Sequence, residues 1–150
     1  MARIRNLMTV VAIASAIVAS AAPAQAQSPE QAMLNKANSF RRAHGLGKLH
    51  MSGSLMGSAS KYAHQLMRSG YFGHSNRIHA SGHYRRLGEI LEIQRGLQPN
   101  INLAFNTWLH SSGHRAIIMD RSFNYAGAGR AAGRFHGHNS TIWVMHFGRP

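Results

Sequence analysis

The segment from residue 141 to residue 147 constrains the fold most strongly, because its β-branched and aromatic residues predict a strand. In an extended chain, Ile142 and Val144 point to one side, whereas Trp143 and Met145 point to the other. Both faces of this strand are therefore apolar. A strand of this kind lies inside a sheet that is covered on both sides, so we expect layers of helix on either face.

The rest of the chain supplies candidates for those layers. Helical spacing of apolar residues predicts helices that begin near Ser28, Ser52 and Pro99, and Gly45 and Gly70 should end the first two. Further strands are predicted at 88–93 and 123–133, with a turn at 137–140 before the final strand. Small residues in the 123–133 strand suit a close approach to another backbone. We therefore predict an α+β fold, a three-layer α-β-α sandwich with a largely antiparallel sheet.

Residues 1–26 have the pattern of a secretory signal peptide. Arg3 and Arg5 precede an uncharged apolar run at 7–22, and Ala24-Gln25-Ala26 is a small-x-small cleavage site. An uncleaved anchor is the alternative, but the run is shorter than the roughly 20 residues that span a bilayer. We expect cleavage after Ala26, a single domain at 27–150 without a transmembrane segment, and a secreted or periplasmic location.

The charge of the chain is strongly positive, at +13 with neutral histidines. Without Arg3 and Arg5, 15 Lys and Arg face four acids, which leaves +11. Such a charge favours anionic partners, such as lipids or glycans of the cell envelope. The basic residues are scattered singly or in pairs, so we expect no specific nucleic-acid binding. The chain has no cysteine, which excludes disulfides and thiolate chemistry.

Two features are candidates for a functional site. On the strand at 88–93, Glu89 shares its face with Leu91 and Ile93, so its carboxylate needs a partner. The polar corner at 112–115 holds His114 between two apolar segments, where a serine can cap the second one. A long polar loop at 71–86 adds further candidates. By contrast, we expect His146 in the last strand to be a hydrogen-bonded core histidine.

A set of short motifs, in this order and spacing, is similar to the CAP superfamily of cysteine-rich secretory, antigen five and pathogenesis-related proteins. The resemblance is to small bacterial members and covers nearly the whole of 27–150. Its motifs are Asn38-x-x-Arg41 with Gly45-Leu46 and Leu49, Ala63-His64-x-Leu66-Met67, Phe72-Gly73-His74-Ser75, Gly88-Glu89, Trp108-x-x-Ser111-x-Gly113-His114-Arg115, the small-residue strand at 127–129, and the strand at 143–148.

The resemblance implies a cleft in which His74, Glu89 and His114 converge, and in some relatives such a cleft binds a divalent metal such as zinc. Two departures weaken the ligand set. Ile90 stands where the family has an Asn, and Ser111 stands where it has a second acid. Two imidazoles and one carboxylate with a water are chemically adequate for zinc. The alternative is that the histidines only satisfy a buried acid. Ser75 and Ser111 are expected to line the cleft.

Three functions follow, in order of preference. The first is an exported, non-enzymatic binding domain whose cleft and basic surface hold an envelope lipid or glycan. The second is a cationic envelope protein that acts through charge alone. The third is a hydrolase that uses a metal-bound water or a Ser75 or Ser111 hydroxyl activated by a histidine. The sequence has no G-x-S-x-G motif, and its only Asp, Asp120, is not placed to orient a histidine, which disfavours the hydrolase.

Overall fold

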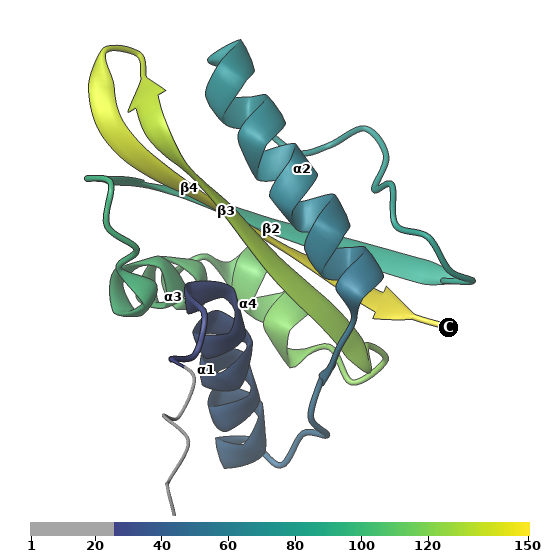
Figure 1. The fold of residues 1–150 in the computed structure, drawn as a ribbon. Coiled ribbons are helices and arrows are strands. Elements are labelled where there is room, and N and C mark those ends of the chain that lie inside the picture. The colour runs from purple at the N-terminus through teal and green to yellow at the C-terminus, as the bar shows by residue number, and fades with distance from the viewer. Residues whose placement is uncertain (1–25) are drawn as a thin grey trace, which may run out of the picture.

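The computed structural model describes residues 26–150, so the expected signal peptide lies outside the described part except for Ala26. A four-stranded sheet separates α2 on one face from α1, α3 and α4 on the other (Figure 1). The predicted three-layer α+β architecture is confirmed. In chain order the elements are α1 (Pro29–Ala43), β1 (His50–Met51), α2 (Gly53–Ser69), β2 (Arg86–Arg95), α3 (Ile101–His110), α4 (Ser112–Met119), β3 (Tyr125–Phe135) and β4 (His138–Arg149).

The sheet is mixed, with strand order β1-β3-β4-β2. β4 pairs antiparallel with both β2 and β3, which makes it a central strand as the sequence predicted. The two-residue strand β1 pairs parallel with β3 and was not predicted. The turn before β4 is also shorter than expected. It consists of His136 and Gly137, which have φ angles of 47° and 81°, and residues 138–140 already belong to β4.

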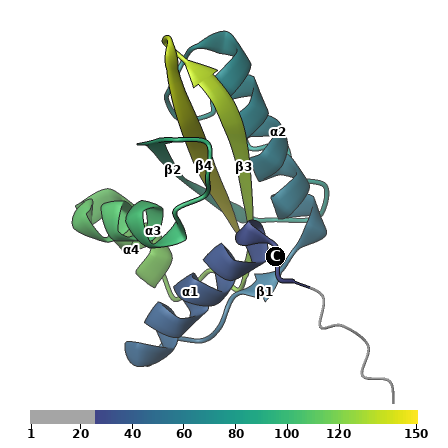
Figure 2. The same cartoon turned by 60° about the vertical axis from the view of Figure 1, so that its left-hand side comes forward.

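The single helix α2 packs closely on one face of the sheet, as both views of the ribbon show (Figures 1 and 2). Ile142 and Val144 are fully buried beneath it. A Cβ at Gly127 or Gly129 of β3 would collide with the backbone of α2. The small residues of this strand therefore serve the close backbone approach that their sequence predicted. This packing fixes α2 against β3 and β4.

The other face carries the larger core, between the sheet and helices α1, α3 and α4. Trp143 and Met145 are fully buried here, in the alternation expected for β4. The indole of Trp108 on α3 donates a hydrogen bond to the carbonyl of Leu91, with Nε1 2.9 Å from the oxygen. This bond ties α3 to β2. Within the described residues, no helix is long and apolar enough to cross a membrane.

Arg41 is a buried cation that the helical pattern of α1 did not predict, and only 1% of it is exposed. Its guanidinium donates hydrogen bonds to the carbonyls of Gly47, Ile118, Asp120 and Phe123 at 2.7–3.3 Å. Burial lowers the pKa of Arg41, and nearby Asp120 opposes this shift. Arg41 thus joins α1 to the last turn of α4 and to the segment that follows α4 through backbone oxygens.

Candidate functional site

Glu89 is the centre of a hydrogen-bonded cluster at the end of the sheet where β2 begins. It lies on the α2 face of β2 and stands opposite His146 of β4 in the strand register. His146 donates from Nε2 to Glu89 Oε2 at 2.9 Å, and His74 donates from Nδ1 to Oε1 at 3.0 Å. The backbone N–H of Ser75 also donates to Oε1, at 2.8 Å. Both carboxylate oxygens are therefore engaged, as a buried acid requires.

These donors control the ionisation of Glu89. Burial raises the pKa of its carboxyl group, but the hydrogen bonds from His146, Ser75 and His74 outweigh burial and hold the pKa at about 2. Glu89 is therefore a carboxylate at neutral pH, and hydrogen bonds to the charged form explain this. The nitrogens that face it, His146 Nε2 and His74 Nδ1, carry the hydrogens.

His114 lies beside this cluster without joining it. Its ring centroid is 6.1 Å from that of His74, and its Nδ1 is buried without a hydrogen-bond partner. Burial, followed by the proximity of His74, lowers the pKa of His114, which favours the neutral imidazole. The residue lies in the first turn of α4, because Ser111 is the N-cap and its Oγ accepts from the His114 backbone N–H at 3.5 Å. The predicted serine cap is confirmed, but the corner at 112–115 is helix rather than loop.

The structure therefore brings His74 and Glu89 together and sets His114 against His74. These three side chains do not form a three-ligand metal site as they stand. Within residues 26–150, no group of three or more His, Cys, Asp or Glu side chains is placed to hold an ion. Both oxygens of Glu89 already accept hydrogen bonds from protein donors. Two imidazoles remain, one fewer than the three protein ligands of catalytic zinc sites.

The two candidate serines do not form a nucleophile–base pair with a histidine. Ser75 Oγ is buried without a hydrogen-bond partner, and Ser111 Oγ is used as the helix cap. A hydroxyl nucleophile normally lies within hydrogen-bond reach of its base. The described geometry thus gives the hydrolase hypothesis no support at Ser75 or Ser111.

The structure confirms His146 as a buried, hydrogen-bonded histidine. The sequence did not identify its partner, which is Glu89. A signal was present in the alternation of the last strand. His146 lies two residues beyond Val144 and so shares the α2 face, which is also the face of Glu89.

A groove opens between α2 and the loop at 71–84, next to this cluster. The hydroxyl of Tyr62 on α2 donates to the Gly73 carbonyl at 2.7 Å and holds the start of the loop against the helix. The groove has a volume of about 410 Å³, and an adjoining cavity of about 260 Å³ shares part of its wall. Lining residues of the groove include Tyr62, Gln65, Tyr71, His74, Arg77 and His79.

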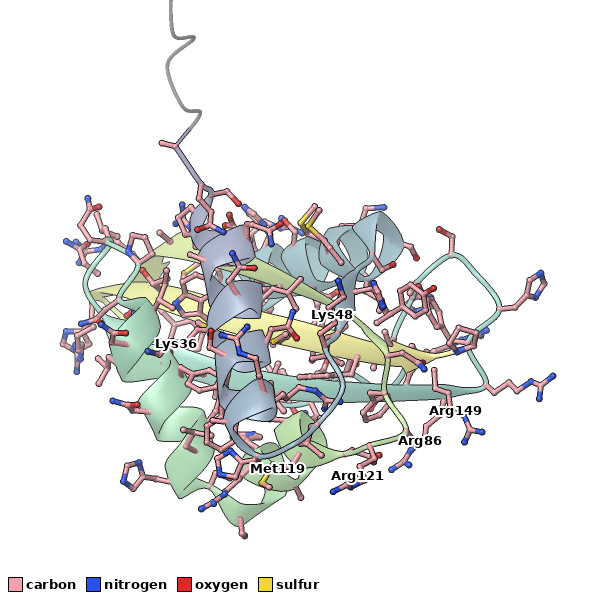
Figure 3. The ribbon with its side chains drawn as sticks, turned by 90° about the horizontal axis from the view of Figure 1, so that it is seen from below. Lys36, Lys48, Arg86, Met119, Arg121 and Arg149 are labelled. Atoms are coloured by element: carbon pink, nitrogen blue, oxygen red, sulfur yellow. The ribbon has the colours of Figure 1, made fainter. Side chains whose placement is uncertain are left out.

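Few acids oppose the positive charge at the surface of the protein, because two of the four are buried and the other two are ion-paired. Glu89 is held by histidines, and Glu92 is buried, with 5% exposed. The other two acids form ion pairs, Asp120 with Arg86 at 2.8 Å and Glu30 with Arg130 at 2.9 Å. Figure 3 shows Arg86, Arg121 and Arg149 near one another at the end of the sheet, where Arg86 and Arg149 are register partners.

A family model matches most of the domain. The model of the CAP family, described as the cysteine-rich secretory protein family, matches residues 34–147. No curated protein matches the chain in sequence.

Solved structures of similar fold include the following three. An outer surface protein of Borrelia burgdorferi has a TM-score of 0.63 and 18% identity, over 79% of this chain and 90% of that one. An extracellular protein of Bacillus anthracis that contains an SCP domain has a TM-score of 0.64 and 19% identity, over 81% of this chain and 40% of that one. Venom allergen-like protein 4 of Schistosoma mansoni has a TM-score of 0.62 and 15% identity, over 83% and 90%.

Proposed function

Because the chain belongs to the CAP family, we propose that it is an exported, non-enzymatic binding domain for an anionic ligand of the cell envelope. The ligand is a lipid head group or a glycan, and it binds in the groove between α2 and the loop at 71–84. One observation carries this proposal. Two of the four acids are buried and the other two are ion-paired, and neither of the ion-paired acids lines the groove, so no free carboxylate opposes the positive charge at its rim.

Part of the positive charge of the protein lies at the groove. Arg77 and His79 of the loop line it and are exposed, and Tyr62 presents an aromatic wall. The one carboxylate nearby, Glu89, is held beneath the groove by His74, His146 and the Ser75 N–H, so its charge is compensated. A ligand phosphate or carboxylate therefore gains charge-assisted hydrogen bonds at the groove.

Binding to phosphatidylglycerol vesicles and to polygalacturonate tests the proposal. Arg77→Ala should weaken binding at about 0.15 M salt, where exposed charges further apart than roughly 8 Å are screened. Arg68→Ala is the matched control, because Arg68 is an exposed cation in the last turn of α2 and does not line the groove. Equal losses in the two variants, with all binding removed by about 0.5 M salt, would instead identify a protein that acts through charge alone.

A second proposal is weak binding of a divalent metal such as zinc by His74 and His114. Its support is the neutral form of His114, with an unpartnered Nδ1, beside a His74 whose Nδ1 is held by Glu89. A carboxylate behind a histidine is a common way to orient a metal ligand. With only two protein donors, we expect weak affinity that falls further below about pH 6 as the imidazoles protonate.

Calorimetric titration with zinc at about pH 7.5 and at about pH 5.5 tests this second proposal. Heat at the higher pH that His114→Ala abolishes would support it. The control is His110→Ala, because His110 is exposed on α3. An equal response from wild type and His114→Ala would exclude His114 as a ligand.

A further inference from the structure

Tyr71 and Phe72 are two adjacent aromatic side chains that the fold leaves exposed. They follow the C-cap of α2, and 61% of Tyr71 and 37% of Phe72 is accessible. The other exposed large apolar side chains of the described residues are not aromatic and are not adjacent in sequence; they are Met51, Leu97 and Leu103. Single exposed apolar residues are normal on a protein surface, whereas an exposed apolar patch with a polar rim marks an interaction site.

The chain around this aromatic pair is fixed to the rest of the fold. The hydroxyl of Tyr62 on α2 donates to the carbonyl of Gly73, the residue that follows the pair, at 2.7 Å. A Cβ at Gly73 would collide with the phenol ring of Tyr71, so this ring lies directly against the chain. The backbone N–H of Ser75 is bonded in turn to Glu89 of β2 at 2.8 Å. The aromatic pair is therefore presented from a segment that is tied to both α2 and β2.

The surface around the aromatic pair is cationic. Tyr71 lines the groove together with Arg77, which is exposed. No acidic residue occurs between Glu30 and Glu89 in the sequence, so α2 and the loop at 71–84 carry none. Glu89 itself is buried and accepts hydrogen bonds on both oxygens. The exposed rings therefore adjoin a surface that attracts anions.

Size and chemistry decide between a protein and a membrane as the partner of this surface. Two aromatic side chains bury about 150–250 Å² each, which is well below the roughly 800 Å² per partner of a stable protein interface. A membrane requires no such area, because aromatic rings anchor at the level of the head groups and nearby cations bind anionic lipids. The aromatic pair and its cationic surroundings supply both kinds of contact.

We propose that Tyr71 and Phe72 dock the protein on an anionic membrane surface, with the mouth of the groove towards the lipid head groups. The proposal rests on the proposed envelope-binding function and narrows its ligand to the head group of an anionic lipid within a bilayer. Tyr71 also lines the groove, so docking brings Arg77 to the head groups. The loop at 71–84 lies on the α2 side of the sheet, and helices α1, α3 and α4 cover the face turned away from the membrane (Figure 1).

Phe72→Trp tests the docking directly, because both native tryptophans, Trp108 and Trp143, are 0% exposed and stay out of reach of lipid. With phosphatidylglycerol vesicles, the emission of Phe72→Trp should move to shorter wavelength, and brominated acyl chains should quench it. Leu103→Trp is the matched control, because Leu103 is 48% exposed on α3, across the sheet from α2, and its emission should not change. Equal quenching of the two variants, or quenching of neither, would overturn the proposal.

Binding measurements separate the aromatic contribution from that of charge. Phe72→Ala should weaken binding to phosphatidylglycerol vesicles by about tenfold, as expected when burial of one aromatic ring is lost. Leu103→Ala removes an exposed apolar side chain elsewhere and should leave binding unchanged. Vesicles of phosphatidylcholine carry no net charge and should bind at least about tenfold more weakly. Equal effects of the two substitutions, or equal binding to the two lipids, would contradict the docking.

Failure of this inference can be told apart from failure of the proposed function, because polygalacturonate is a soluble probe that offers no membrane. If Arg77→Ala weakens polygalacturonate binding more than Arg68→Ala does, but Phe72→Trp and Leu103→Trp respond alike, only the docking is wrong. If Phe72→Trp alone is quenched while Arg77→Ala and Arg68→Ala behave alike with every probe, the docking stands and the groove is not the binding site.

Discussion

Two buried glutamates of β2, Glu89 and Glu92, lie three positions apart and face opposite sides of the sheet. Their exposure is nearly the same, 7% and 5%. Glu89 receives hydrogen bonds on both oxygens, from two histidines and a backbone N–H. Glu92 lies on the other face, where its Oε2 has no partner, and the Nε1 of its register neighbour Trp143 has none either.

The difference in partners reverses the ionisation of the two groups. Burial raises the pKa of Glu92 to about 7, whereas the hydrogen bonds to Glu89 outweigh burial and hold its pKa at about 2. Burial is the only cause of the pKa shift at Glu92, and Arg130, which faces the same side from β3, is itself paired with Glu30 at 2.9 Å. Equal burial is thus accompanied by pKa shifts in opposite directions. The α2 side of β2 provides hydrogen-bond donors for a carboxylate, whereas Glu92 Oε2 on the other side has none.

Removal of the Glu89 charge should have the largest effect. Glu89→Gln leaves His146 buried without its anionic acceptor. It also places the N–H₂ of the new amide against groups that are themselves hydrogen-bond donors. We expect the free energy of unfolding to fall by about 3–5 kcal/mol, as for other broken buried pairs. Urea denaturation at neutral pH measures this change. A loss no larger than that of an exposed surface substitution would show that the cluster contributes little to stability.

The matching change on the other face, Glu92→Gln, should have the opposite sign. The raised pKa of Glu92 means that the folded state binds a proton that the unfolded state loses above about pH 4.5. Stability is therefore fully present below that pH and is lost as the pH rises through about 7. Glu92→Gln removes this loss, so we expect it to stabilise the protein by up to about 3 kcal/mol at about pH 8. At about pH 4.5 it should have little effect.

Urea denaturation of both proteins across this pH range checks the sign. Because wild type and Glu92→Gln share every other titrating group, their difference isolates Glu92. A difference that does not change with pH would contradict an unpartnered acid at this position.

At low pH the group that titrates is Glu89 rather than Glu92. The depressed pKa of Glu89 contributes stability that is complete above about pH 4.5 and is lost as the pH falls through about 2. The difference in unfolding free energy between wild type and Glu89→Gln should therefore shrink over this acid range. Acid titrations of the two proteins, followed by circular dichroism, measure it. A constant difference would mean that Glu89 does not titrate as described.

His146→Gln should have the smallest effect, because a glutamine amide can still donate to Glu89. We expect a loss of about 1 kcal/mol in unfolding free energy and an upward shift of the Glu89 pKa by about one unit. Carbon-13 NMR of the glutamate carboxyls reports the shift directly. The control is His110→Gln on the surface of α3, which should leave the Glu89 pKa unchanged.

The sequence predicted the layers of this fold because each depends on a local pattern. Alternation at 141–147 placed Val144 and Met145 on the correct faces, and the small residues Gly127 and Gly129 indicated the close approach of another backbone, which is that of α2. The face of Glu89 and its need for a partner were also predictable. Such features depend only on residue type and the period of the strand or helix.

The missed features depend on contacts between distant segments. His146 meets Glu89 only because β2 and β4 pair in one register, and Arg41 is buried because its partners are backbone oxygens that have no sequence signature. The unpartnered state of Glu92 has the same origin. The alternation of β2 placed Glu92 on the α1 and α3 face, but nothing in the sequence shows which donors lie within reach of its carboxylate.

The most direct test of this account asks which face of β2 responds to an anionic lipid. In NMR spectra of the isotopically labelled protein, soluble short-chain phosphatidylglycerol should move the amide signals of Tyr62 and Ser75, which lie on the α2 side. The indole Nε1–H signal of Trp143, beside Glu92 on the other face, should stay in place. Movement of the Trp143 indole with no change at Tyr62 and Ser75 would contradict the account, because the ligand would then bind on the face that lacks the groove.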